Sequence, residues 1–170
     1  MTIARDYITD DPIAVLLRYG SDILRNPKYL KLKEYKQHQR STTYDHCVAV
    51  TLSALKTAKK RHFKVNASIL VRGCLLHDYF LYDCHEKGHP KHHWFLHGIH
   101  AAMNAMHDFG INEVEADMIA NHMWPLHPLR FPIHPEGWLL VYSDKKEAFK
   151  DAFGKKRLKE REKLKAIETR

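Results

Sequence analysis

Hydrophobic positions recur along this chain with helical spacing, and we find no run of alternating apolar and polar residues that would indicate a half-buried strand. Side chains that recur every three to four residues form one face of an amphipathic helix, and this face must be covered by a neighbour. The pattern therefore predicts an all-α fold, a single-domain helical bundle of about six to seven helices.

Capping residues and prolines divide the pattern into segments. Asp11-Pro12 is typical of an N-cap followed by proline at the first helical position, and Asn112 with Glu115 resembles a capping box. Gly110 is expected to end the helix before it. The predicted helices cover residues 12–26, 28–38, a segment that begins at Ser41 or Thr42, and residues 66–82, 94–109, 112–122 and 136–153.

Two stretches between these segments read as loops. Residues 83–93 contain Gly88 and Pro90 and have no apolar period. Residues 123–135 contain four prolines, which exclude regular helix. We expect the two loops to form the mouth of any site in the bundle.

Side chains of the types that bind metals occur in order along the chain, one or two for each of several predicted helices. A single histidine on an apolar helix face is more often a hydrogen-bonded core residue, but a helical bundle can bring several such residues to one central site. Imidazole and carboxylate ligands without thiolate suit Mn, Fe, Co, Ni or Zn, and Mg is possible. The candidate metal ligands are His46, His77, Asp78, His97, His122 and Asp144.

Asp78 is the pivotal member of this set because it directly follows a candidate ligand, His77. Its two oxygens could each bind one ion and so bridge two divalent ions. Two ions about 3.5–4 Å apart can generate hydroxide from a bridging water and clamp the entering and leaving oxygens of a phosphoryl group. The set therefore favours phosphoryl chemistry at a binuclear site.

The ordered ligands resemble the His-Asp (HD) domain metal-dependent phosphohydrolases, whose signature is H…HD…D on a helical bundle. The resemblance spans residues 40–153, in the segments TTYDHCVAV, LLHDYFLYD, HGIHAAMNA, NHMWPL and EGWLLVYSDK. It implies that one ion is bound by His46, His77, Asp78 and Asp144, and a second by Asp78, His97 and His122. The spacing from His97 to the alanine pair after it fits the family's pattern better than that of His100.

Four further residues are candidates for catalysis together with Asp78. Lys145 and Arg130 could meet the charge on a transferred phosphoryl group, although a solvated helix face and loop solubility explain them equally well. Asp83 could relay protons or orient a ligand histidine, or be a surface acid. His93 could face the mouth of the site and protonate a departing alkoxide.

A dense group of histidines and one cysteine in the first loop could instead form an independent zinc site. Such a site would need a helix that places its ligands on one face. Gly88 and Pro90 would break this helix, so they disfavour the zinc site. This group consists of Cys84, His85, His89, His92 and His93.

The leading functional hypothesis is metal-dependent hydrolysis of a phosphomonoester or phosphoanhydride, a nucleotide above all, by a metal-bridging hydroxide. A second hypothesis is a non-catalytic, metal-containing module that binds an acidic partner through a basic tail. A third is an HD-type di-iron oxygenase, because His and carboxylate ligands also serve oxygen chemistry.

The distribution of charge along the chain divides it into three parts. The net charge is +8, and residues 155–170 carry eight Lys and Arg against three Glu. We expect residues 1–39 to form N-terminal helices packed on the core, 40–154 to form the HD domain, and 155–170 to form a basic, helical tail. Nucleic acid is a conceivable partner of this tail, although a solvated helix is the simpler interpretation.

The remaining composition points to a cytoplasmic protein without a membrane partner, whereas the small phosphorylated substrate is what the resemblance to the HD family implies. The three cysteines have no C-x-x-C spacing, which favours a reducing compartment. No apolar run approaches the length that spans a membrane, and no N-terminal stretch has the pattern of a signal peptide.

Overall fold

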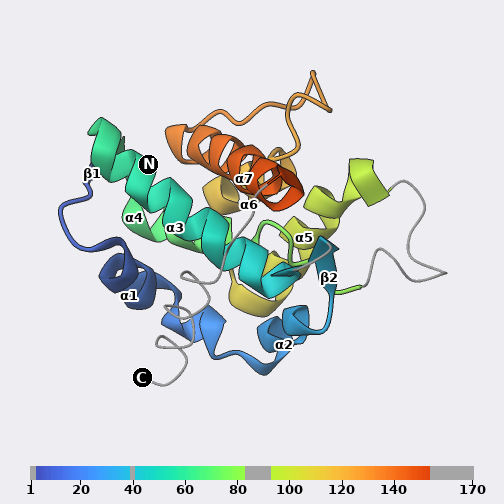
Figure 1. The fold of residues 1–170 in the computed structure, drawn as a ribbon. Helices are drawn as coiled ribbons and strands as arrows, with labels where there is room; N and C mark the ends of the chain where they lie inside the picture. The colour runs from blue at the N-terminus through green and yellow to red at the C-terminus, as the bar shows by residue number, and fades with distance from the viewer. Residues whose placement is uncertain (1–2, 39–40, 83–92, 154–170) are drawn as a thin grey trace.

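A computed structural model describes residues 3–38, 41–82 and 93–153 of the chain. These residues form seven α-helices and little strand, so the expected all-α bundle is confirmed (Figure 1). The helices are α1 (Pro12–Leu24), α2 (Pro27–Leu30), α3 (Thr43–Arg61), α4 (Ala67–Leu76), α5 (His93–Phe109), α6 (Glu113–Ala120) and α7 (Pro135–Phe153), and a 3-10 helix, η1, covers Lys31–Lys33.

Four short strands accompany the helices, although the sequence pattern predicted none. The strand β1 (Asp6–Tyr7) pairs antiparallel with β4 (Lys64–Val65), and β2 (Lys36–His38) pairs antiparallel with β3 (Ser41–Thr42). The first pair fastens the N-terminal segment to the connection between α3 and α4. The second closes the chain back on itself just before α3.

The predicted helix over residues 28–38 is wrong. Helix α2 ends at Leu30, and η1 and β2 follow it. In this segment Tyr29 and Leu32 are fully buried, whereas the lysines around them are exposed. Two buried side chains provide too little tertiary contact to stabilise three helical turns.

Helix α4 is the centre of the bundle, with α1, α3, α6 and α7 packed around it. Its residues Leu70, Val71, Leu75 and Leu76 have no exposed surface. Gly73 allows α6 to approach, because a Cβ there would overlap Met118. The nearly continuous apolar pattern of this segment therefore reflects burial on several sides.

Two helices end earlier than the sequence predicted, and the candidate ligands follow these ends. Helix α4 ends at Leu76 instead of near residue 82, and α6 ends at Ala120 instead of at His122. Adjacent residues of an α-helix point in directions about 100° apart. Because the chain leaves the helix at His77, the adjacent side chains of His77 and Asp78 can point to the same place.

No helix among the described residues is both long and apolar enough to cross a membrane.

Candidate metal centre

Five segments of the bundle bring the six candidate ligands together in its interior. One comes from the first turn of α3, two from the turn after α4, and one each from α5, the end of α6 and α7. All six side chains are buried, namely His46, His77, Asp78, His97, His122 and Asp144.

The local sequence explains why the first of these helices begins where it does. Thr42 and Asp45 form a capping box at the start of α3, in which each side chain accepts a hydrogen bond from the other residue's backbone N–H. This reciprocal cap fixes the first turn of the helix. His46 therefore projects from an ordered helix start.

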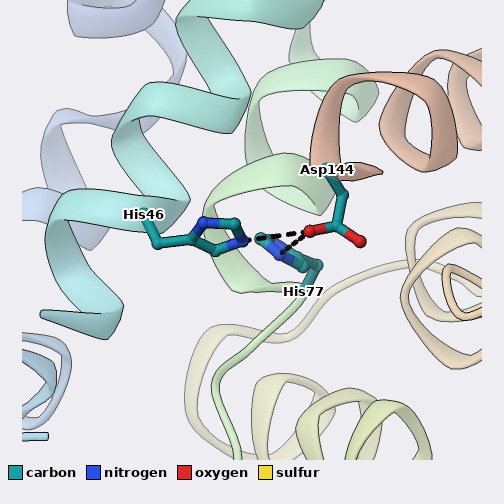
Figure 2. Close-up of side chains that lie close together, drawn as sticks. All are labelled: His46, His77 and Asp144. Atoms are coloured by element: carbon teal, nitrogen blue, oxygen red, sulfur yellow. Dashed lines mark hydrogen bonds and ion pairs between the residues drawn. The ribbon is translucent and has the colours of Figure 1, made fainter. Parts of the chain in front are cut away.

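The first group of ligands consists of His46, His77 and Asp144, which Figure 2 shows converging from three segments. Asp144 Oδ1 lies 3.0 Å from Nε2 of His46 and 3.8 Å from Nε2 of His77. These three atoms lie close enough together to share one ion.

The second group consists of His77, Asp78 and His122, whose ligand atoms also lie close enough together to share one ion, and His97 lies beside it. The Nε2 atoms of His97 and His122 are 3.0 Å apart, and they lie 3.5 and 3.6 Å from Asp78 Oδ1. Gly98 allows this approach, because a Cβ at that position would lie only 3.0 Å from the carbonyl oxygen of Ile119 at the end of α6.

Asp78 joins the two groups through its two carboxylate oxygens. Its Oδ2 atom lies 3.6 Å from Nε2 of His77 and 4.0 Å from Nε2 of His46, whereas Oδ1 faces His97 and His122. One oxygen is therefore directed to each pair of histidines. This is the arrangement of a carboxylate that can bridge two ions.

The distances and the hydrogen bonds fit transition-metal ligation. Donor atoms that bind one ion at about 2.0–2.2 Å lie roughly 2.8–3.6 Å apart, close to the separations observed. Nδ1 of His77 donates to the carbonyl oxygen of Cys74 at 2.8 Å, and Nδ1 of His122 donates to that of Ile119 at 2.7 Å. These bonds leave the Nε2 lone pairs directed into the centre.

His77 provides a further sign that a cation belongs in this centre. Its Nε2 atom is buried and has no hydrogen-bond partner among the described residues. A buried polar atom without a partner is costly, and native structures contain few of them. A metal ion at this position would satisfy it.

Burial and neighbouring charges set the protonation of the centre. Burial lowers the pKa of His77 and lowers that of His122 to about 3, so both rings are neutral, as metal ligation requires. Burial opposes ionisation of Asp144, but the hydrogen bond with His46 and the neighbouring charges of His46, Lys145 and His77 together outweigh it and lower the pKa of Asp144. The pKa of Asp78 is lowered too, because imidazoles on both sides outweigh the effect of burial. Two ionised carboxylates therefore face a set of buried imidazoles.

The two expected cations lie in different surroundings. Nζ of Lys145 donates to Oδ2 of Asp144 at 2.8 Å and to the carbonyl oxygen of His122 at 3.4 Å, so Lys145 lies at the edge of the centre. Arg130 is exposed on the loop before α7, and within the described residues its guanidinium makes no hydrogen bond or ion pair. Of the two, only Lys145 is brought to the ligands.

The candidates in the first loop lie outside the part of the chain that the structure describes. Asp83 and the cluster from Cys84 to His92 lie outside the described residues, and so does the side chain of His93, whose backbone begins α5. His100, the alternative to His97, is half-buried and packs its ring 6.2 Å from that of Tyr82. Of this pair, it is His97 that points into the centre.

Two residues that support the ligands, Asp151 and Tyr29, were not predicted from the sequence. Oδ2 of Asp151 lies 4.0 Å from Nδ1 of His46, on the face opposite Asp144 Oδ1. Asp151 follows Asp144 by two helical turns, so a search for polar residues at that spacing could have identified it. Tyr29 donates to the carbonyl oxygen of Leu75, and no local sequence signal announces this long-range contact.

Comparisons with protein-family models, with curated proteins and with solved structures found no match to this chain.

Proposed function

We propose that the chain is an HD-type metal-dependent phosphohydrolase that hydrolyses a phosphomonoester or phosphoanhydride, of nucleotide type. The observation that carries this proposal is the placement of Asp78, whose Oδ2 lies nearest His77 and His46 and whose Oδ1 lies nearest His97 and His122. Two ions held by one carboxylate suit in-line displacement at phosphorus. The order of the ligands in the chain and the resemblance to the HD family support the same assignment.

The residues divide between two ions. His46, His77, Asp78 and Asp144 would hold one, and Asp78, His97 and His122 the other. When bound, divalent Mn, Fe, Co, Ni or Zn, or Mg, would supply a hydroxide nucleophile at neutral pH and neutralise charge on the phosphoryl oxygens.

The protein's own side chains would position these groups and their substrate. Lys145 holds Oδ2 of Asp144 through its ammonium group, which fixes the orientation of that carboxylate. Its side chain is still 39% exposed, so the same ammonium group can meet an incoming phosphate. We therefore assign to Lys145 the role of substrate cation, for which Arg130 was the other candidate.

The test is hydrolysis of a panel of nucleotides and other phosphoesters by metal-stripped protein, before and after addition of Mn²⁺ or Co²⁺. We expect metal-dependent turnover of one substrate class, and a loss of about 10³-fold or more in Asp78→Asn because metal and nucleophile depend on this carboxylate. Asp6→Asn, an exposed acid on β1, is the matched control and should keep full activity. Full activity in Asp78→Asn would refute the proposal.

A second readout separates this function from oxygen chemistry at the same ligands. The iron-loaded protein is supplied with the same substrates while oxygen is monitored with an electrode. A phosphohydrolase releases phosphate without consuming oxygen. Stoichiometric oxygen consumption without phosphate release would replace the proposal with a di-iron oxygenase.

We also propose a reducing, cytoplasmic setting. The two cysteines within the described residues, Cys47 and Cys74, are buried free thiols. A chain of this size with a core of its own does not need a disulfide framework. Nucleic acid as a partner of residues 155–170 stays a prediction, because these residues lie outside the described part.

A further inference from the structure

Residues 124–150, the loop before α7 and most of that helix, expose an unusual set of apolar side chains. On the loop these are Leu126, Leu129, Phe131 and Ile133, and Leu129 is 93% exposed. Large apolar patches on a protein surface mark sites of interaction more often than chance exposure does. The segment that carries them, between α6 and α7, projects from the bundle in Figure 1.

Helix α7 continues this exposed surface with aromatic rings. Trp138, Tyr142 and Phe149 are exposed, and their spacing places them on one side of the helix. The rings of Trp124 and Trp138 pack 5.1 Å apart, which holds the loop against the first turn of α7. We call the exposed side chains of residues 124–150 the apolar-basic surface.

Acidic and basic side chains of this surface differ in their exposure to solvent. The acidic residues of the segment, Glu136, Asp144 and Glu147, are buried. The cations Arg130, Lys145, Lys146 and Lys150 are exposed or half-buried, and two of them form ion pairs, Lys145 with Asp144 and Lys150 with Glu147. The charge that this surface presents to solvent is therefore positive, and Arg130 and Lys146 are its cations without a carboxylate partner among the described residues.

The loop is also held in a defined shape. Pro132 is buried against Gly137, where a Cβ would lie only 2.5 Å from the Cβ of the proline. The residues on both sides of it, Phe131 and Ile133, point outward and are exposed. Proline fixes its own φ and restricts the residue before it, so the loop loses little entropy when it binds.

We propose that the apolar-basic surface docks the protein on an anionic lipid membrane. The exposed aliphatic side chains of the loop would enter the acyl boundary, the aromatic rings of α7 would lie among the headgroups, and the cations would face anionic lipids. Such peripheral binding needs no spanning helix, and it differs from the sequence prediction of no membrane partner. It is also independent of the metal centre.

The other possible occupants fit these side chains less well. A single-stranded nucleic acid would use the cations and rings, but Leu129 and Ile133 cannot stack on bases. A second copy in an isologous dimer would bring the same cations of two chains together, and like charges across an interface oppose association. An anionic lipid surface satisfies the aliphatic, aromatic and cationic side chains at once.

The experiment is cosedimentation of the full chain with vesicles of phosphatidylcholine, alone or mixed with phosphatidylserine. We expect binding to the mixed vesicles, and a loss of about tenfold or more in partition coefficient for Leu129→Ser combined with Ile133→Ser, because each CH₂ group in lipid is worth about fourfold. The matched control is Phe63→Ser combined with Met103→Ser, two exposed apolar residues on other elements, which should bind as the native chain does.

Tryptophan fluorescence distinguishes insertion of the apolar-basic surface into the bilayer from electrostatic attraction of the lipids to residues 155–170. Brominated phosphatidylcholine in the mixed vesicles should quench part of the tryptophan emission, and Trp138→Phe should remove that part. Equal binding of the native chain and the Leu129 and Ile133 variant would overturn the proposal. So would variant-sensitive binding to a single-stranded oligonucleotide without vesicle binding, or variant-sensitive dimerisation in sedimentation.

Discussion

Tyr29 supports the ligand-bearing turn from a distance, and its removal makes a quantitative test. The fully buried hydroxyl of Tyr29 donates to the carbonyl oxygen of Leu75 at 2.9 Å, in the last turn of α4. Because α4 ends at Leu76, this carbonyl lies among the last four of the helix, which have no partner within it. The hydroxyl therefore caps the helix just before His77 and Asp78.

In Tyr29→Phe the ring stays, and the hydroxyl is lost together with this hydrogen bond and its side-chain hydrogen bond with Cys47. A buried carbonyl left without its partner costs about 1–3 kcal/mol of unfolding free energy. For a chain of this size that cost corresponds to a fall of roughly 2–12 °C in Tm. Since the turn after α4 loses its support, the affinity for Mn²⁺ should also fall, by about tenfold, as for other residues that orient metal ligands.

The assay is urea unfolding of metal-free protein, followed by calorimetric titration with Mn²⁺. Tyr19→Phe is the matched control, because Tyr19 is half-buried beside a surface cavity and should change stability by less than about 0.5 kcal/mol. Native stability in Tyr29→Phe would show that the hydroxyl does not cap α4. Lower stability with unchanged Mn²⁺ affinity would refute the link between this cap and the ligands.

Three further predictions concern the bundle itself. Gly110 has φ +57° and open space around its Cβ position, so Gly110→Ala should cost about 1 kcal/mol in urea unfolding through the backbone alone; no cost would contradict the assigned conformation. Thr42→Ala removes the cap on the backbone N–H of Asp45 and should cost about 1 kcal/mol, measured the same way, whereas Thr42→Ser should be nearly neutral. The hydrogen bond from Lys28 lowers the pKa of Asp108 to about 2, so its stabilisation is present above the ordinary carboxyl pKa near 4 and is lost as the pH falls toward 2. Lys28→Met should therefore be less stable than the native chain at pH 7 in thermal unfolding, and the difference should shrink as the pH falls from about 4 through about 2; a constant difference would contradict this.

The fold could be predicted from the sequence where local signals decide it. The caps Asp11 and Asn112 and the stop at Gly110 are where the pattern placed them, because these side chains bond to nearby backbone or adopt a conformation that glycine favours. The ends of α4 and α6 could not be predicted in this way. The hydroxyl that caps α4 comes from Tyr29, 46 residues away in the chain.

In the candidate centre, too, some features could be predicted from the sequence and others depend on how the helices pack. The sequence predicts that His46, the His77-Asp78 pair and Asp144 meet, because these residues lie on separate apolar helical segments that must pack together in one bundle. The pairing of each oxygen of Asp78 with two histidines depends on how four helices pack. Asp151 was missed because its role depends on the orientation of one imidazole ring.

The most direct test of a bridging Asp78 is a count of bound metal. Metal-stripped protein is dialysed to equilibrium against Co²⁺ or Mn²⁺, and the bound ions are measured by mass spectrometry. The account predicts about two ions per native chain and fewer than one in Asp78→Asn, because one carboxylate serves both positions. Retention of both ions by Asp78→Asn, or the absence of any bound ion in the native chain, would contradict it.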